Sequence, residues 1–149
     1  MDKFIKEWKK TVIIFSLIVF IAFFLRVYNL TILPVFADEA IYVRWAQVMR
    51  NEPTLRFLPL SDGKQPLFMW SVIPFLKFFS DPLFAGRFVS ALTGISTSVT
   101  VFLLSIFLFK SKKIALFAAL FYAVVPFAVF FDRMALVDSM LTSFGVWTL

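Results

Sequence analysis

The 149-residue chain contains no cysteine and no histidine. Without cysteine, a disulfide framework and a thiol nucleophile are both excluded within this chain. Without histidine, the side chain whose ordinary pKa lies closest to neutral pH is missing, and with it any histidine-based metal or acid–base site. Carboxylates are therefore the plausible catalytic groups in this sequence.

Charge is also scarce, since only 16% of the residues are Asp, Glu, Lys or Arg, whereas 61% are hydrophobic and 22 are phenylalanine. A mean hydropathy of +0.91 exceeds what a soluble core of this length can bury, so the composition predicts a multispan membrane protein. The net charge is +6, but the basic residues are dispersed among apolar runs. This pattern favours membrane lipids as partners and argues against nucleic acid.

Four apolar runs, over about residues 11–30, 88–109, 114–131 and 138–149, predict transmembrane helices, because a helix needs about 20 apolar residues to span a bilayer. The fourth run has only about ten residues before the sequence stops. We therefore expect the all-α transmembrane domain of an N-terminal fragment, with its last helix incomplete. Such a fragment is expected to be inactive alone, because missing helices would complete its core and site.

Basic residues at 3–10 and 110–113 flank the first span and fill the turn between the second and third spans. The positive-inside rule places both groups in the cytoplasm of a multi-pass plasma membrane protein. The apolar segment 66–79 must then not cross, and it is short and contains Pro74. The N-terminus also resembles a signal peptide with a cleavage site at residues 35–37, although its apolar run is long for that purpose.

The first external loop, about residues 31–86, is far longer than most helix connections, which predicts a functional role. Ile41, Trp45 and Val48 recur at helical spacing, with charged residues elsewhere on the segment. This amphipathic pattern predicts an interfacial helix, and a polar turn at residues 61–65 separates it from a second one.

Several segments, in this order and at these distances from the predicted spans, resemble glycosyltransferase family 39, which includes protein O-mannosyltransferases and lipid A aminoarabinose transferases. These segments are Asp38-Glu39, Lys64-Gln65-Pro66, residues 84–90, residues 133–136 and Asp138. The resemblance implies a GT-C fold. It also implies transfer of a sugar from a polyprenyl-phosphate carrier to an acceptor protein, lipid or glycan on the extracytoplasmic face.

No cofactor is implied by the spacing of these residues. Some relatives have a zinc-binding acid where this chain has Gly63, so no metal is expected at that position, and a divalent cation elsewhere is a weak option.

Within this resemblance, Asp38, Glu39 and Asp138 are the candidate catalytic residues. Asp38 is expected to accept the proton of the attacking hydroxyl, and Asp138 to orient the acceptor or hold a cation. Each also has a purely structural interpretation. Asp38 and Asp138 could cap the helices that follow them, and Glu39 could interact with a helix dipole.

Lys64, Arg87 and Arg133 are the candidate ligands of the donor's lipid phosphate, because cationic groups stabilise the charge that develops on this leaving group. The alternatives are a snorkelling role for Lys64, headgroup anchoring for Arg87 and an interfacial ion pair between Asp132 and Arg133.

A different class of function, a transporter or lipid flippase without catalytic activity, would normally place ionisable groups near the middle of broken helices. This chain keeps its charges near the ends of the predicted spans, which favours the transferase.

Overall fold

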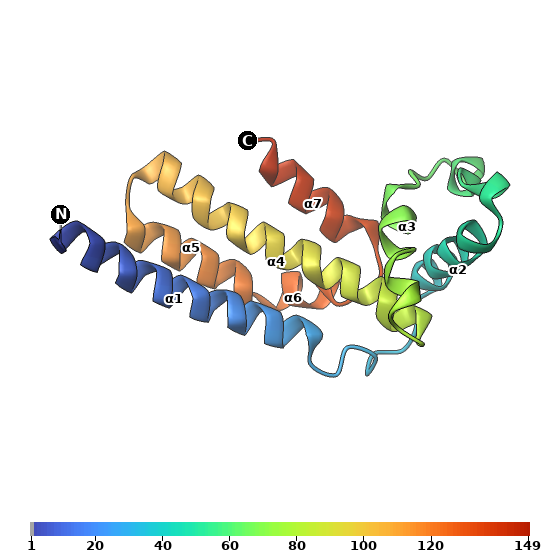
Figure 1. Ribbon diagram of the computed structural model, residues 1–149, viewed down its shortest axis with the longest axis horizontal. Helices are drawn as coiled ribbons and strands as arrows, with labels where there is room; N and C mark the ends of the chain where they lie inside the picture. Colours follow the sequence, from blue (N-terminus) through green and yellow to red (C-terminus); the bar gives the residue numbers. More distant parts are fainter. Residues whose placement is uncertain (1) are drawn as a thin grey trace.

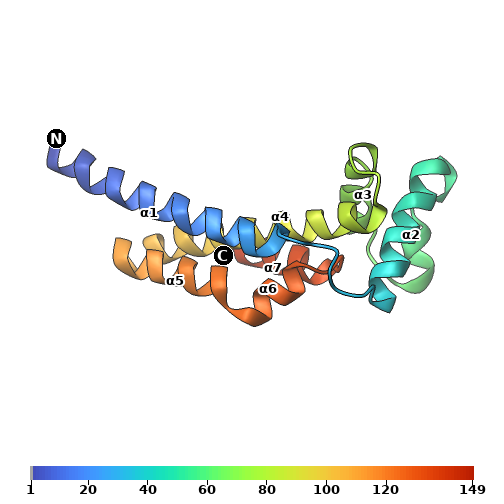
Figure 2. The same ribbon diagram turned by 90° about the horizontal axis from the view of Figure 1, so that it is seen from below.

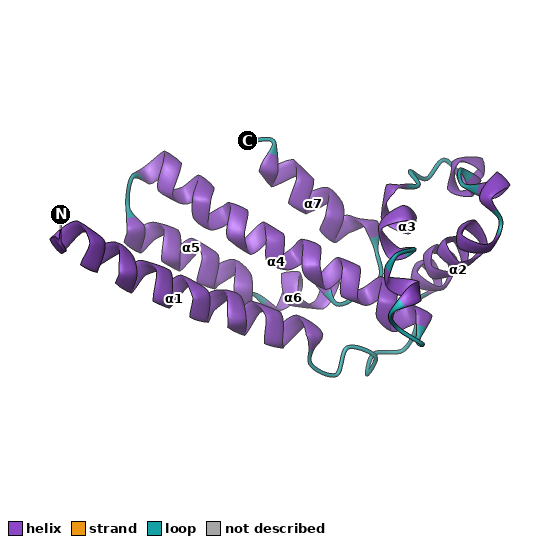
Figure 3. Ribbon diagram, in the orientation of Figure 1, coloured by secondary structure: helices purple, strands orange, loops and turns teal. Residues whose placement is uncertain are grey.

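The computed structural model describes residues 2–149, with side chains described from Trp8 onward, and this part of the chain contains helices and no strand (Figure 3). The α-helices are α1 (Asp2–Val27), α2 (Ala37–Asn51), α3 (Leu67–Val72), α4 (Pro82–Phe109), α5 (Lys112–Val124), α6 (Pro126–Asp132) and α7 (Val137–Trp147). Short 3-10 turns cover Pro53–Leu55, Leu58–Asp62 and Phe75–Lys77.

Helices α1, α4 and α5 form a bundle in which α4 is antiparallel to the other two (Figure 1). Ala115, Ala119 and Ala123 recur every fourth residue on α5 and are fully buried in the bundle core. Small side chains at this spacing let membrane helices approach closely. The rings of Phe15 on α1 and Phe102 on α4 stack at 4.0 Å in the same core.

Two helices, Trp8–Val27 within α1 and Pro82–Phe109, are long and apolar enough to cross a membrane. Helices α5 and α6 form a third candidate if the bent pair is taken as one span. The expected all-α membrane architecture is therefore confirmed. The four predicted spans correspond to α1, α4, the bent pair and α7, of which α7 has only 11 residues.

The predicted third span is broken at Pro126, with an angle of 59° between α5 and α6. Proline has no N–H to donate to the carbonyl of Tyr122, and its ring disfavours a helical conformation at the preceding residue. Val125 accordingly takes extended dihedral angles, and α5 ends at Val124.

Helix α4 begins at Pro82, earlier than the predicted start at residue 88. The side chain of Asp81 accepts a hydrogen bond of 2.9 Å from the Leu83 amide, and proline is favoured in the first helical turn. This start places Arg87 within the helix rather than in the loop before it.

A second core lies where α2 and α3 pack against the beginning of α4 and the segment around the start of α7. It includes Tyr42, Phe68, Val89, Met134 and Met140. Figures 1 and 2 both place α2 and α3 at one end of the molecule and the N-terminus and the α4–α5 turn at the other. The first loop is thus a packed structure beyond one end of the bundle.

Candidate active site

The adjacent acids Asp38 and Glu39 lie in the first turn of α2 and have opposite environments. Glu39 is fully buried, whereas Asp38 is exposed and has no side-chain hydrogen bond or ion pair within the described part of the chain. Successive residues of a helix point about 100° apart, so one neighbour can face the core while the other faces solvent. The structure therefore separates two acids that look equivalent in the sequence.

The Glu39 carboxylate is held by four hydrogen bonds. Arg87 donates from Nε and Nη2 at 2.8 Å each, the Ala135 amide at 2.7 Å and the Phe36 amide at 3.0 Å. Burial alone would raise the pKa of Glu39, but the hydrogen bonds from Arg87, Ala135 and Phe36 and the charge of Arg87 together hold the pKa below its ordinary value of 4.5. Glu39 is thus an ionised structural anchor.

The Phe36 contact also identifies the beginning of α2. Phe36 occupies the N-cap position, and its amide is satisfied by Glu39 three residues later. The suggested capping role of Asp38 is therefore wrong in this structure, where the Ala40 amide donates to the Phe36 carbonyl. Asp38 has no capping role here that would occupy its oxygens.

Arg87 uses all five of its N–H donors inside the protein. Two bind Glu39, and the others bind the carbonyls of Leu30, Leu33 and Pro34 at 3.0–3.1 Å. The side chain is fully buried. Arg87 thus ties the segment after α1 to the beginning of α2, and no donor is left over for a lipid phosphate.

Arg133 donates hydrogen bonds to backbone carbonyls at the C-terminal end of α1. Its Nη1 donates to the carbonyls of Leu25 (2.7 Å) and Tyr28 (2.9 Å), and its Nη2 donates to the Asn29 carbonyl at 2.8 Å. Asn29 has a left-handed φ of 48°, which terminates the helix. Burial and the nearby charge of Arg87 lower the pKa of Arg133. The phosphate-binding roles of both arginines stay predictions, and the observed contacts of both are with the protein itself.

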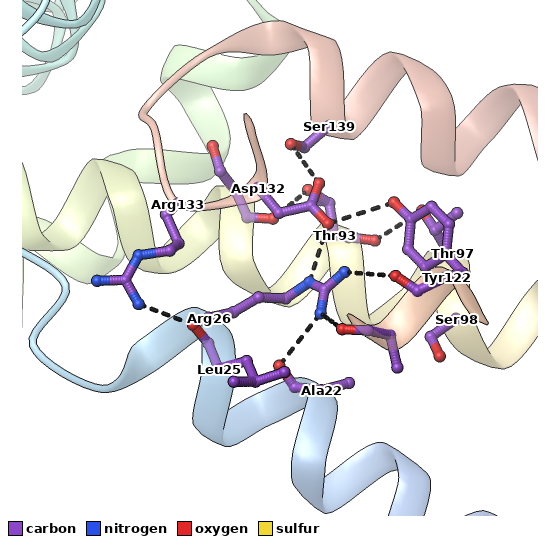
Figure 4. A network of polar contacts seen from close by, with 12 residues as sticks. Ala22, Leu25, Arg26, Thr93, Thr97, Ser98, Tyr122, Asp132, Arg133 and Ser139 are labelled. Atoms are coloured by element: carbon purple, nitrogen blue, oxygen red, sulfur yellow. Dashed lines mark hydrogen bonds and ion pairs between the residues drawn. The ribbon is translucent and has the colours of Figure 1, made fainter. Parts of the chain in front are cut away.

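Asp132 pairs with Arg26 and not with its neighbour Arg133, so the suggested Asp132–Arg133 ion pair is wrong. The Arg26 Nε lies 2.9 Å from Asp132 Oδ2, and both side chains are buried (Figure 4). Asp132 also accepts hydrogen bonds from the Ser139 hydroxyl at 2.7 Å and the Tyr122 hydroxyl at 3.3 Å. Four segments of the chain meet at this one carboxylate.

Arg26 also donates hydrogen bonds to backbone carbonyls at the break between α5 and α6. Its Nη1 donates to the Ala123 carbonyl at 2.9 Å, and its Nη2 donates to the Tyr122 carbonyl at 3.3 Å. These are carbonyls at the end of α5, where the helix is interrupted before Pro126. This role of Arg26 was not predicted from the sequence, although a single arginine in an otherwise apolar run signals a buried partner.

Asp138 is exposed in the first turn of α7 and, like Asp38, has no side-chain hydrogen bond or ion pair among the described residues. Leu136 occupies the N-cap position and contributes no side-chain cap. The suggested capping role of Asp138 is therefore wrong here. Its negative charge near the beginning of a helix is nevertheless favourable.

Lys64 is exposed and lines a groove of about 340 Å³ between the first loop and α7. The other lining residues are predominantly apolar: Gly63, Gln65, Leu67, Phe68, Val137, Met140, Leu141 and Phe144. The groove thus brings Lys64 beside the first turns of α7, the helix that carries Asp138. An apolar wall with one cation suits a ligand that has an apolar chain and an anionic group.

The side chains described from Trp8 onward include no group of three or more His, Cys, Asp or Glu residues that could hold a metal ion. The candidate groups that the structure leaves exposed are two carboxylates, Asp38 and Asp138, and one lysine, Lys64.

Together, these features define a helical membrane protein whose exposed acids lie at the loop end of the bundle. Residues 58–149 match the family model of dolichyl-phosphate-mannose-protein mannosyltransferases, and the chain belongs to this family. It is therefore a mannosyltransferase-type glycosyltransferase, which confirms the resemblance seen in the sequence. Lys64, Arg87, Arg133 and Asp138 lie within the matched region, whereas Asp38 and Glu39 precede it.

No curated protein and no solved structure matches the chain.

Proposed function

We propose that the complete protein transfers a sugar from a polyprenyl-phosphate carrier to a hydroxyl of an acceptor, on the extracytoplasmic face of the plasma membrane. Mannose and a protein acceptor are the choices that the family's description favours. The hydroxyl oxygen attacks the anomeric carbon while the bond from that carbon to the phosphate oxygen breaks. The hydroxyl proton passes to a carboxylate, and the lipid phosphate leaves with the bonding electron pair.

Asp38 is the proposed base. This proposal is based on the different environments of Asp38 and Glu39. The Glu39 carboxylate accepts hydrogen bonds from Arg87 and two backbone amides, whereas the Asp38 carboxylate is exposed and accepts none from a described residue. A general base must be ionised and able to reach the proton it accepts. Glu39 meets the first condition only, because it is fully buried.

Lys64 is the proposed ligand of the leaving phosphate. It is exposed at an apolar groove, whereas Arg87 has all its donors occupied by the protein. A lysine ammonium near the breaking bond stabilises the negative charge that develops on the phosphate. Asp138, on the helix that forms the other wall of this groove, is proposed to orient the acceptor.

The test is transfer of labelled mannose from a polyprenyl phosphate to acceptor peptides by the complete protein in detergent. Asp38→Asn should lower turnover by about 10²–10⁴-fold, the usual value of general-base help, without changing thermal stability. Asp62→Asn, which alters another exposed acid of the same loop, should keep normal turnover. Normal turnover by Asp38→Asn would refute the assignment of the base and move the search to Asp138.

A transporter or flippase, the alternative considered from the sequence, is disfavoured by the family match. The charges buried in the described bundle are also paired with each other, as in Arg26–Asp132.

A further inference from the structure

The two exposed acids occupy similar local settings. Asp38 is followed by Glu39, and Asp138 is followed by Ser139, and both of these second residues are buried. Glu39 is hydrogen-bonded to Arg87, 48 positions away in the sequence, and Ser139 to Asp132, seven positions before it. Neither acid has a side-chain partner of its own among the described residues. Each acid thus directly precedes a residue whose side chain is held by hydrogen bonds.

Both neighbours make hydrogen bonds within a single short stretch, residues 132–139, which runs from the last residue of α6 to the first turn of α7. Glu39 Oε1 accepts a hydrogen bond of 2.7 Å from the Ala135 amide. The Ser139 hydroxyl donates to Asp132 Oδ1 at 2.7 Å and closes the stretch on itself. The beginning of α2 and the beginning of α7 are thus joined through one connection.

The anchor points of this connection cannot move freely. Asp132 is fixed by Arg26, which is itself bound to the carbonyls at the end of α5 (Figure 4). The Asp132 carboxylate also packs directly on Gly94 of α4, where a β-carbon would overlap it. Glu39 is fixed from the other side by Arg87, another residue of α4.

We propose that Glu39, Asp132 and Ser139 are positioning residues that set the distance between Asp38 and Asp138. Glu39 holds the first acid against the connection, and Ser139 and Asp132 hold the second. The link to catalysis depends on the function proposed above, but the geometric claim does not. Displacement of a reacting group by about 1 Å can cost about 10²-fold in rate, so such a framework has a direct use in a site built from separate elements.

Because these 149 residues contain no cysteine, a direct distance measurement needs only that any cysteine elsewhere in the protein be replaced by serine. Spin labels on Asp38→Cys and Asp138→Cys of the complete protein should give one narrow distance distribution by pulsed electron paramagnetic resonance. Ser139→Ala removes one hydroxyl and leaves the Arg26–Asp132 ion pair in place, so the protein should remain folded. It should broaden the distribution. Ser143→Ala, the matched control on the same helix, changes another buried serine and should leave the distribution narrow.

Activity is measured on the same serine variants without labels. Ser139→Ala should lower kcat by about tenfold with little change in the KM of the donor, whereas Ser143→Ala should alter neither. An unchanged distance distribution in Ser139→Ala would overturn the positioning role, and so would a broadened distribution with unchanged kcat. Absence of any transfer by the unsubstituted protein would refute the proposed function and leave the distance test valid.

Discussion

At the residue scale, the main feature is the use of arginine side chains as ligands for backbone carbonyls. Arg26, Arg87 and Arg133 together bind carbonyls around the end of α1 and at the end of α5, and two of them also pair with buried carboxylates. Carbonyls outside regular helix need partners when they are buried, and a guanidinium can satisfy several at once. The positive charges of Arg87 and Arg26 are neutralised by the adjacent carboxylates of Glu39 and Asp132.

The environment of Glu39 predicts a pH dependence of stability. The folded protein holds the pKa of Glu39 below 4.5, so the unfolded chain binds the proton first as the pH falls. The contribution of Glu39 to the free energy of unfolding is therefore complete above about pH 4.5 and is lost progressively below it. Unfolding measured between pH 3 and pH 7 in detergent should show this loss.

Glu39→Gln provides the comparison, because it removes the titrating group at a fully buried position. The variant should be less stable at pH 7 by about 3–5 kcal/mol, since it leaves the buried Arg87 without its counter-charge. Its stability should also fall less steeply with acid than that of the unsubstituted protein. Equal acid sensitivity in the two proteins would show that Glu39 does not titrate in this way.

At the element scale, the close contact of α4 with α6 depends on a glycine. A β-carbon at Gly94 would overlap the side chain of Asp132, whereas one at Gly145 of α7 would meet no atom within 4 Å. Gly94→Ala should therefore destabilise the protein by about 1–3 kcal/mol, the usual cost of overpacking. Gly145→Ala should be neutral or stabilise it by about 1 kcal/mol, because alanine is the better helix former.

Thermal unfolding of both alanine variants in the same detergent measures the difference. A similar melting temperature for Gly94→Ala and Gly145→Ala would contradict the contact between Gly94 and Asp132. Because both substitutions are glycine to alanine within helices, intrinsic helix propensity contributes about equally to the two.

Much of the element order could be predicted from the sequence because hydrophobic length is a local property. The first span, α4 and the amphipathic α2 follow from runs and spacing that need no tertiary information. The sequence analysis expected one unbroken helix over residues 114–131, so the break at Pro126 was not predicted. The hydrogen bonds that Arg26 makes to the carbonyls at this break join residues about a hundred positions apart. Pairing of this kind is decided by packing, so periodicity does not reveal it.

For the candidate site, too, the residue types could be predicted from the sequence, but their tertiary contacts could not. Exposure of Asp38 and burial of Glu39 follow from the direction in which α2 packs, and two adjacent acids in one helical turn carry no mark of that direction in the sequence. The same limit applies to Arg87, whose predicted place at the outer end of a span does not reveal its five internal hydrogen bonds.

At the scale of the whole molecule, the structure has two chemically different ends. At one end, the Lys112 ammonium lies 4.5 Å from the ring centre of Trp8, which joins the turn after α4 to the N-terminal part of α1. At the other end lie the loop helices α2 and α3 (Figure 1). Asp38 lies in the first turn of α2, and Lys64 lines the groove beside the beginning of α7, the helix that carries Asp138. Exposed phenylalanines such as Phe20, Phe107 and Phe117 line the bundle between them, as expected of a surface that faces lipid.

This arrangement predicts the membrane topology. If α1 and α4 both cross the bilayer, the N-terminus and the α4–α5 turn share one side, and the loop carrying Asp62 lies on the other. The positive-inside rule, applied to the short basic clusters at residues 3–10 and 110–113, assigns their side to the cytoplasm. In intact cells, a membrane-impermeant maleimide should therefore label Asp62→Cys at once and Lys113→Cys only after permeabilisation. Both positions are exposed, and the chain has no other cysteine. Labelling of both from outside would show that α4 does not cross, and labelling of Lys113→Cys alone would reverse the orientation and place the proposed site in the cytoplasm.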